Sequence, residues 1–182
     1  HKLCGLILSG SNYDAPSTWK IASCAAHLER WRVGGQKPSS ILEKMSFGAF
    51  NNAFKPARTP SDWLSRDHSM VDQYIADPLC GGALTTQSWC DFLQGMAELS
   101  KPESMAKLDS EVPIYLFSGA LDPVGKAGAG VTALQAILHT SGVRKVDMHL
   151  YPEARHETLN ETNRGEVYQD LLTWMASLNS EV

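Results

Sequence analysis

Two residues of the 182-residue chain have the types and positions that acid–base chemistry requires. Asp122 comes shortly after the apolar run 112–117, and His156 comes shortly after a second apolar run, 146–151. A carboxylate that orients an imidazole, with the imidazole acting as general base, makes up two members of a three-residue nucleophilic site. The sequence therefore predicts a catalytic acid residue at Asp122 and a general base at His156.

Ordinary structural roles are the competing interpretation of both residues. Asp122 precedes Pro123, where Asp is common in turns, and His156 fits a polar surface loop. Each residue taken alone favours the structural role. Together they favour the chemical role, because each follows an apolar strand and the carboxyl ends of parallel strands form sites in open α/β sheets.

The elements that must position these residues are strands that alternate with helices. Continuous apolar runs predict strands at 3–9, 112–117 and 146–151, with both faces of each strand buried. Apolar residues at helical spacing predict helices at 131–140 and 167–178. The alternating order indicates parallel strands joined by right-handed crossovers, so the predicted fold class is α/β.

The stretch between the first two strands has a different character. Residues 47–100 contain no convincing strand, carry many aromatic side chains and are divided by prolines and glycines. Apolar spacing predicts helices at Trp19–Trp31, from Ser39 or Ser40 to Met45, after Ser61 or Asp62, near Ser69–Ile75, and from Thr85 or Thr86 to about Leu99. In the first of these, Ile21, Cys24, Ala25 and Leu28 share one face. This stretch is predicted to be a helical insertion rather than part of the sheet.

Residues 113–182 resemble the C-terminal part of an α/β-hydrolase, most closely the monoacylglycerol lipases, lysophospholipases and serine aminopeptidase-type hydrolases. Residues 118–125 resemble the acid loop of that group, and residues 151–161 resemble its histidine loop. The acid precedes the histidine in the chain, as in the family. Less specific likenesses to the helical cap and to the strand entering it are carried by Trp63-Leu64-Ser65-Arg66-Asp67, Val71-Asp72, Asp77-Pro78-Leu79-Cys80 and Gly5-Leu6-Ile7-Leu8-Ser9-Gly10-Ser11.

The resemblance implies a division of the chain and roles for its residues. Residues 1–18 would be a core strand leading to the cap, 19–108 the helical cap or lid, and 109–182 the C-terminal part of the hydrolase core. Asp122 would be the triad acid and His156 the general base. Trp63, Trp89 and Phe92 would line a channel for an apolar substrate, although ordinary helix packing explains each of them singly.

One expected motif of the family is missing from the sequence. The nucleophile elbow Gly-x-Ser-x-Gly occurs nowhere in the 182 residues. We therefore expect this chain to be the C-terminal part of an α/β-hydrolase fold whose N-terminal strands and nucleophilic serine lie in a preceding segment or a companion chain. Asp14, after the first strand, is an alternative candidate for the triad acid, with a poorer loop match than Asp122.

These features predict a serine hydrolase of carboxylic esters with a lipid-like substrate such as a monoacylglycerol or a lysophospholipid. A small-molecule ester and the serine-bearing segment or chain are the expected partners, and no cofactor is expected. Two alternatives stay open. The chain could be a non-catalytic binding or regulatory protein with a hydrolase-derived fold, or the same fold could act on an amide or an epoxide.

Composition excludes several other classes. A formal net charge of −4 argues against nucleic-acid binding, and no apolar run approaches the length of a transmembrane segment. Cys4, Cys24, Cys80 and Cys90 are too scattered for a zinc site or disulfide framework, and His156-Glu157-Thr158-Leu159-Asn160 lacks the second histidine of a metalloprotease motif. We expect no metal site, reduced thiols and a cytoplasmic location, with membrane association as the alternative.

Overall fold

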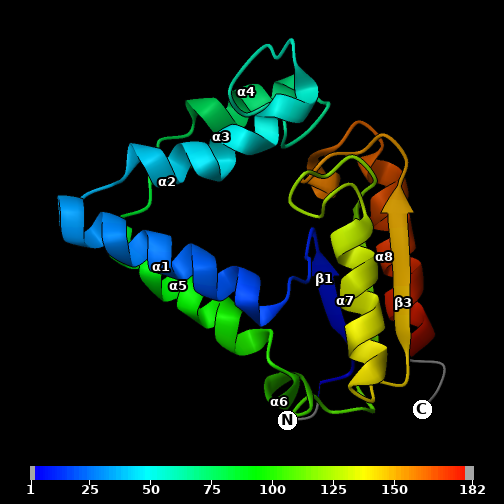
Figure 1. Ribbon diagram of the computed structural model, residues 1–182. Helices are drawn as coiled ribbons and strands as arrows, with labels where there is room; N and C mark the ends of the chain where they lie inside the picture. The colour runs from blue at the N-terminus through cyan, green and yellow to red at the C-terminus, as the bar shows by residue number, and fades with distance from the viewer. Residues whose placement is uncertain (1–2, 179–182) are drawn as a thin grey trace.

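The computed structural model of the protein describes residues 3–178, in which each strand is followed by one or more helices (Figure 1). In chain order they are β1 (Leu6–Ser9), α1 (Pro16–Val33), α2 (Ser40–Met45), α3 (Phe47–Phe50), the short 3-10 helix η1 (Asn51–Phe54), α4 (His68–Ala76), α5 (Thr86–Leu99), α6 (Pro102–Met105), β2 (Ile114–Gly119), α7 (Ala129–Thr140), β3 (Val146–Tyr151), the 3-10 helix η2 (Thr158–Asn160) and α8 (Arg164–Leu178).

Within the described residues the three strands form one parallel sheet in the order β1-β2-β3. Ile114 at the start of β2 lies opposite Leu6 on one side and Val146 on the other. All six residues of β2 are buried, as its continuous apolar sequence predicts. β1 differs from the prediction of a strand buried on both faces: Ile7 is 36% exposed, because β1 pairs with β2 alone in this part of the chain.

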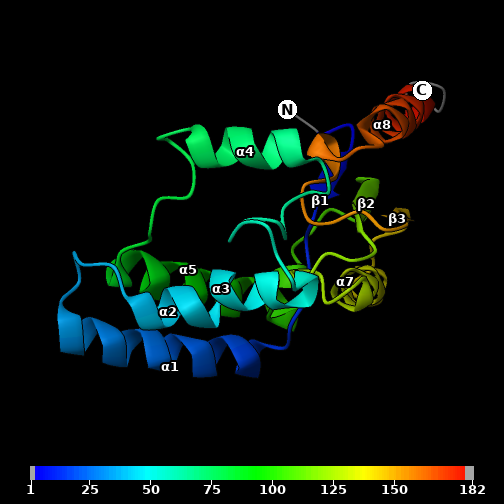
Figure 2. The ribbon, with the colours of Figure 1, turned by 90° about the horizontal axis from the view of Figure 1, so that it is seen from above.

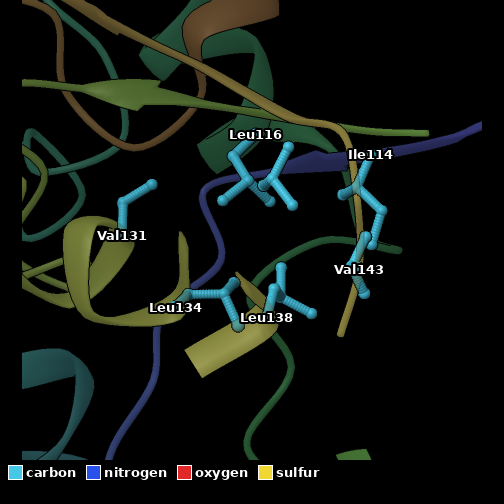
Figure 3. Packing of buried hydrophobic residues seen from close by; sticks show 7 residues of the cluster. Ile114, Leu116, Val131, Leu134, Leu138 and Val143 are labelled. Carbon is cyan, nitrogen blue, oxygen red and sulfur yellow. The ribbon is translucent and has the colours of Figure 1, made fainter. Parts of the chain in front are cut away.

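Helices cover both faces of the sheet, which confirms the predicted α/β architecture. Side chains of β2 alternate between the two faces, so Ile114 and Leu116 pack under α7 while Tyr115 and Phe117 pack under α8. Figure 2 shows α7 and α8 on opposite sides of the strands, and Figure 3 shows the α7 side of this core. The sheet is therefore a rigid support for the loops that follow β2 and β3.

The helices between β1 and β2 lie beside the sheet (Figure 1). α1 and α5 lie side by side and share a core that includes Ala26, Trp89 and Leu93 (Figures 1 and 2). The face of α1 that carries Ile21 and Leu28 points away from this core, with these side chains 73% and 68% exposed. Among the described residues, no helix has the length and apolar character needed to cross a membrane.

The prediction of a helix after Ser61 or Asp62 is wrong. This segment forms turns, because the Asp62 carboxylate accepts hydrogen bonds from the backbone N–H groups of Arg58 (2.6 Å) and Thr59 (3.1 Å) and so closes a loop instead of starting a helix. Four short elements, α3, η1, α6 and η2, were not predicted, since three or four residues are too few for a periodic apolar pattern. The first helix begins at Pro16, three residues before the predicted start.

Candidate active site

Asp122 and His156 are in direct contact at the carboxyl ends of β2 and β3. Nδ1 of His156 lies 3.0 Å from Oδ2 of Asp122, whose side chain is fully buried. The hydroxyl of Ser118 donates to Oδ2 of the same carboxylate (2.9 Å), and the backbone N–H of Val124 donates to Oδ1 (2.9 Å). An ionised carboxylate only accepts, so in the neutral imidazole the tautomer that this contact favours carries its proton on Nδ1, with a lone pair on Nε2.

The two loops that carry this pair are joined by backbone hydrogen bonds. The N–H of Ala120 donates to the carbonyl of Tyr151 and that of Leu121 to the carbonyl of Ala154, both at 2.9 Å. The crossing point is Gly119, where a Cβ atom would lie 2.1 Å from the carbonyl oxygens of Ala154 and Arg155. Only glycine allows the end of β2 to approach the histidine loop this closely.

The end of β1 supports the imidazole from a third direction. Gly10 follows β1 with a positive φ of 59°, and its N–H donates to the carbonyl of Phe117 in β2 (2.9 Å). A Cβ atom at Gly10 would lie 2.9 Å from Cε1 of His156. The glycine therefore leaves the space that the imidazole ring fills.

A cavity of about 520 Å³ opens beside His156, between the sheet and the helices of the insertion. Trp63, Trp89 and Phe92, the three predicted substrate contacts, line it together with His156. The Trp63 ring lies 5.2 Å from the His156 ring, while Phe92 is half exposed. The rest of the wall is largely apolar and includes Trp19, Ala22, Ala25, Leu42, Met45, Phe47, Phe50, Leu84, Leu93, Met96, Pro123 and Val124.

Charged side chains of the cavity wall are paired with each other. Asp14 contacts Nζ of Lys126 and lies 3.5 Å from the amide nitrogen of Asn12, which also donates to the carbonyl of Val124 (3.0 Å). Within residues 3–178, the carboxylate bonded to His156 is that of Asp122 and not that of Asp14, the alternative acid.

Charged groups also hold the histidine loop from behind. Burial lowers the pKa of Arg155, whose guanidinium lies 4.1 Å over the Phe54 ring and donates to the backbone carbonyls of Asp62 and Ser65. Burial raises the pKa of the Asp62 carboxyl, but hydrogen bonds from Thr59 and Arg58 outweigh this effect and the net shift is downward. The Asp62 carboxyl thus keeps its charge while partly buried.

The sequence interpretation did not single out Gly10, Gly119, Arg66 or Glu161. The glycines lie in the quoted motifs, but the close approaches that require them connect residues far apart in the chain. Arg66 and Glu161 form an ion pair across 95 positions, which one sequence alone does not reveal.

The part of the chain that the structure describes contains no group of three or more His, Cys, Asp or Glu side chains placed to hold a metal ion. All four cysteines are free thiols, and Cys90 alone is buried.

Comparison with known proteins agrees with this geometry. Residues 1–163 match the family described as "Serine aminopeptidase, S33", so the match covers most of the chain. The chain belongs to this family. A search of curated proteins with this chain finds no match.

Solved structures of esterases and lipases share the fold of this S33 family member. A thermostable carboxyl esterase from Bacillus coagulans, in complex with glycerol, is 27% identical with a TM-score of 0.85. A lipase in an open form is 25% identical with a TM-score of 0.80. A monoglyceride lipase variant from Saccharomyces cerevisiae, at 18% identity and a TM-score of 0.66, shows the fold alone.

The S33 family chain accounts for part of the length of these proteins. The comparison covers 97% of this chain but 57% of the Bacillus coagulans esterase and 57% of the open-form lipase. The shared region contains the parallel strands, their flanking helices and the helical insertion, which agrees with the C-terminal part of an α/β-hydrolase fold.

Proposed function

We propose that this chain provides the acid and the general base of a serine hydrolase that cleaves carboxylic esters of lipid-like alcohols or acids. The observation that carries the proposal is the 3.0 Å contact between His156 and the buried Asp122, at the wall of a largely apolar cavity. The esterase and the lipase that share the fold at 25–27% identity support the choice of an ester bond.

In the proposed reaction Nε2 of His156 removes the proton from a serine hydroxyl as the serine oxygen attacks the acyl carbonyl. The imidazolium then donates this proton to the leaving alcohol. In the second half of the reaction His156 takes a proton from a water molecule that attacks the acyl-enzyme, and it returns this proton to the serine oxygen as the acid leaves. Asp122 holds the tautomer and stabilises the imidazolium. The 182 residues contain no Gly-x-Ser-x-Gly motif, so we assign the serine to a preceding segment or companion chain.

The lining of the cavity is better suited to an apolar ester than to the charged amino terminus of a peptide. An aminopeptidase needs a free carboxylate for the substrate's ammonium group, and the carboxylate in the described cavity wall, Asp14, is already paired with Lys126. Trp63, Trp89 and Phe92 instead offer apolar and aromatic surface to an acyl or alkyl chain.

The substrate class is tested by comparing ester and amide cleavage by the complete gene product. We expect a higher kcat/KM for p-nitrophenyl butyrate than for alanine p-nitroanilide, measured by release of the coloured product. Preference for the anilide would support the amide alternative. A folded protein that cleaves neither would support the non-catalytic binding alternative.

Shortening Phe92 should weaken the binding of long acyl chains. Phe92 is half exposed at the cavity wall, so Phe92→Ala removes apolar contact surface with little effect on folding. We expect kcat/KM for a long-chain p-nitrophenyl ester to fall roughly tenfold, about 1.4 kcal/mol, relative to the acetate ester. Leu172→Ala, on a similarly exposed side chain of α8 outside the cavity, is the control and should leave this ratio unchanged.

Adding a methyl group at Gly10 should displace the imidazole. Gly10→Ala places a Cβ 2.9 Å from Cε1 of His156, and we expect kcat to fall roughly 100-fold if the ring moves by about 1 Å. Gly34→Ala is the matched control: its φ is also positive but nothing lies within 4 Å of the new Cβ. Both variants should lose about 1–3 kcal/mol of stability. Equal kcat values in the two variants would contradict the predicted contact.

A further inference from the structure

Glu161 is a fully buried carboxylate behind the histidine loop, outside the cavity wall. Oε1 accepts hydrogen bonds from the backbone N–H groups of Arg66 (3.0 Å) and Arg155 (2.9 Å). Oε2 accepts from Nε of Arg66 (2.9 Å) and from the backbone N–H of Thr162 (3.1 Å). Four donors thus fill the four lone-pair sites of an ionised carboxylate.

Three of these four donors belong to two segments that both border the imidazole. Arg155 immediately precedes His156, and Arg66 belongs to the segment 63–66 between η1 and α4. The two segments also pair through their backbones. The N–H of Glu157 donates to the carbonyl of Leu64 (2.8 Å), and the N–H of His156 donates to the carbonyl of Trp63 (3.4 Å). Trp63 in turn packs its ring 5.2 Å from the imidazole.

We propose that Glu161 is a positioning residue that fixes His156 and the cavity wall at Trp63 relative to each other. The proposal rests on the proposed function, because it assigns Glu161 to the placement of the general base. Loss of the carboxylate would leave two partly buried backbone N–H groups, of Arg66 and Arg155, without their acceptor. The paired segments would then shift, and with them the ring of His156.

A purely structural role is the competing explanation, and it predicts different kinetics. A structural residue lowers the stability of the protein but leaves the turnover of the molecules that remain folded unchanged. A positioning residue lowers kcat in fully folded protein, because a displacement of about 1 Å at a catalytic group costs roughly 100-fold in rate. KM for a small ester stays nearly constant in that case, since the cavity wall keeps its composition.

The test is Glu161→Gln in the complete gene product. The variant is assayed with p-nitrophenyl butyrate at a temperature well below the unfolding temperature of the variant. Gln keeps the size of the side chain but replaces an acceptor oxygen with an N–H₂ group that faces donors. We expect kcat to fall roughly 10- to 100-fold and KM to change less than about twofold. Wild-type kcat in the folded variant would overturn the proposal.

A second substitution decides the question if Glu161→Gln does not fold. Arg66→Met removes the guanidinium from Oε2 but keeps the backbone N–H bond to Oε1, and Arg66 is partly exposed. We expect a fall in kcat of roughly tenfold, whereas Arg144→Met, which breaks an exposed ion pair with Glu111, should leave kcat unchanged. Equal kcat values for the two Met variants would overturn the proposal.

His156→Ala, measured alongside, separates failure of this proposal from failure of the proposed function. If His156→Ala keeps its turnover, the proposed function itself is wrong. If His156→Ala is inactive while Glu161→Gln keeps wild-type kcat, only the positioning role of Glu161 is wrong.

Discussion

Replacing His156 with alanine should lower kcat for p-nitrophenyl butyrate by roughly 10⁴-fold or more in the complete gene product. The imidazole is the one group of the described cavity wall that is bonded to a buried carboxylate and can also accept a proton on its other nitrogen. Without it the attacking serine keeps its proton, and the departing alcohol leaves as an unprotonated alkoxide. Both chemical steps are then slowed.

The fold should tolerate this change, which makes the kinetic effect interpretable. The His156 side chain is partly exposed, and Asp122 keeps the hydrogen bonds from Ser118 and Val124. Circular dichroism and the unfolding temperature should therefore stay close to those of the wild type. His149→Ala, at a histidine within β3 and outside the cavity wall, serves as the matched control and should retain wild-type turnover. A turnover for His156→Ala within tenfold of the wild type would remove His156 from the mechanism.

The second large effect is expected at Gly119. A Cβ in Gly119→Ala would lie 2.1 Å from two backbone carbonyl oxygens, so the end of β2 and the histidine loop must separate. That separation breaks the hydrogen bonds that join Ala120 and Leu121 to the histidine loop and pulls Asp122 away from His156. We expect a loss of about 3 kcal/mol or more in the free energy of unfolding and a loss of turnover.

Gly95→Ala provides the matched comparison for Gly119→Ala. Gly95 lies inside α5 and nothing lies within 4 Å of its added Cβ, so alanine should raise the free energy of unfolding by up to about 1 kcal/mol. Urea unfolding of the two variants and the wild type measures both changes. Equal stabilities of Gly119→Ala and the wild type would show that the two loops do not cross as closely as described.

The sequence was informative wherever the fold obeys local rules. Asp122 and His156 could be placed near each other because each follows an apolar strand and parallel strands end at the same edge. The burial of β2 followed from its unbroken apolar run, and α5 began at the predicted threonines, with Thr85 as its cap. These features depend on residues that are close in the chain.

Features that depend on distant partners were not predictable in the same way. Helical spacing showed that Ile21 and Leu28 share a face of α1, but not that the opposite side, with Ala22 and Ala26, would pack against α5. The Asp62 carboxylate closes a turn by accepting hydrogen bonds from the backbone N–H groups of Arg58 and Thr59. The sequence does not distinguish this role from that of a helix cap, because Asp occurs in both.

The partners of Glu161 show the same limit at the site itself. From the sequence, Glu161 is indistinguishable from a solvated surface residue. Its ion-pair partner Arg66 lies 95 positions earlier in the chain and contacts it only in the folded structure. Likewise, the need for glycine at position 119 arises from carbonyl groups of the histidine loop rather than from a local turn.

The central claim is that Asp122 and His156 activate a serine that lies outside these 182 residues. A fluorophosphonate probe, which bonds covalently to activated serines, tests it directly when the labelled peptide of the complete gene product or its assembly is mapped by mass spectrometry. We expect one labelled serine outside residues 1–182, with labelling lost in His156→Ala and retained in His149→Ala. Labelling of a serine within residues 1–182, labelling that persists in His156→Ala, or no labelling of the folded assembly would contradict this role of Asp122 and His156.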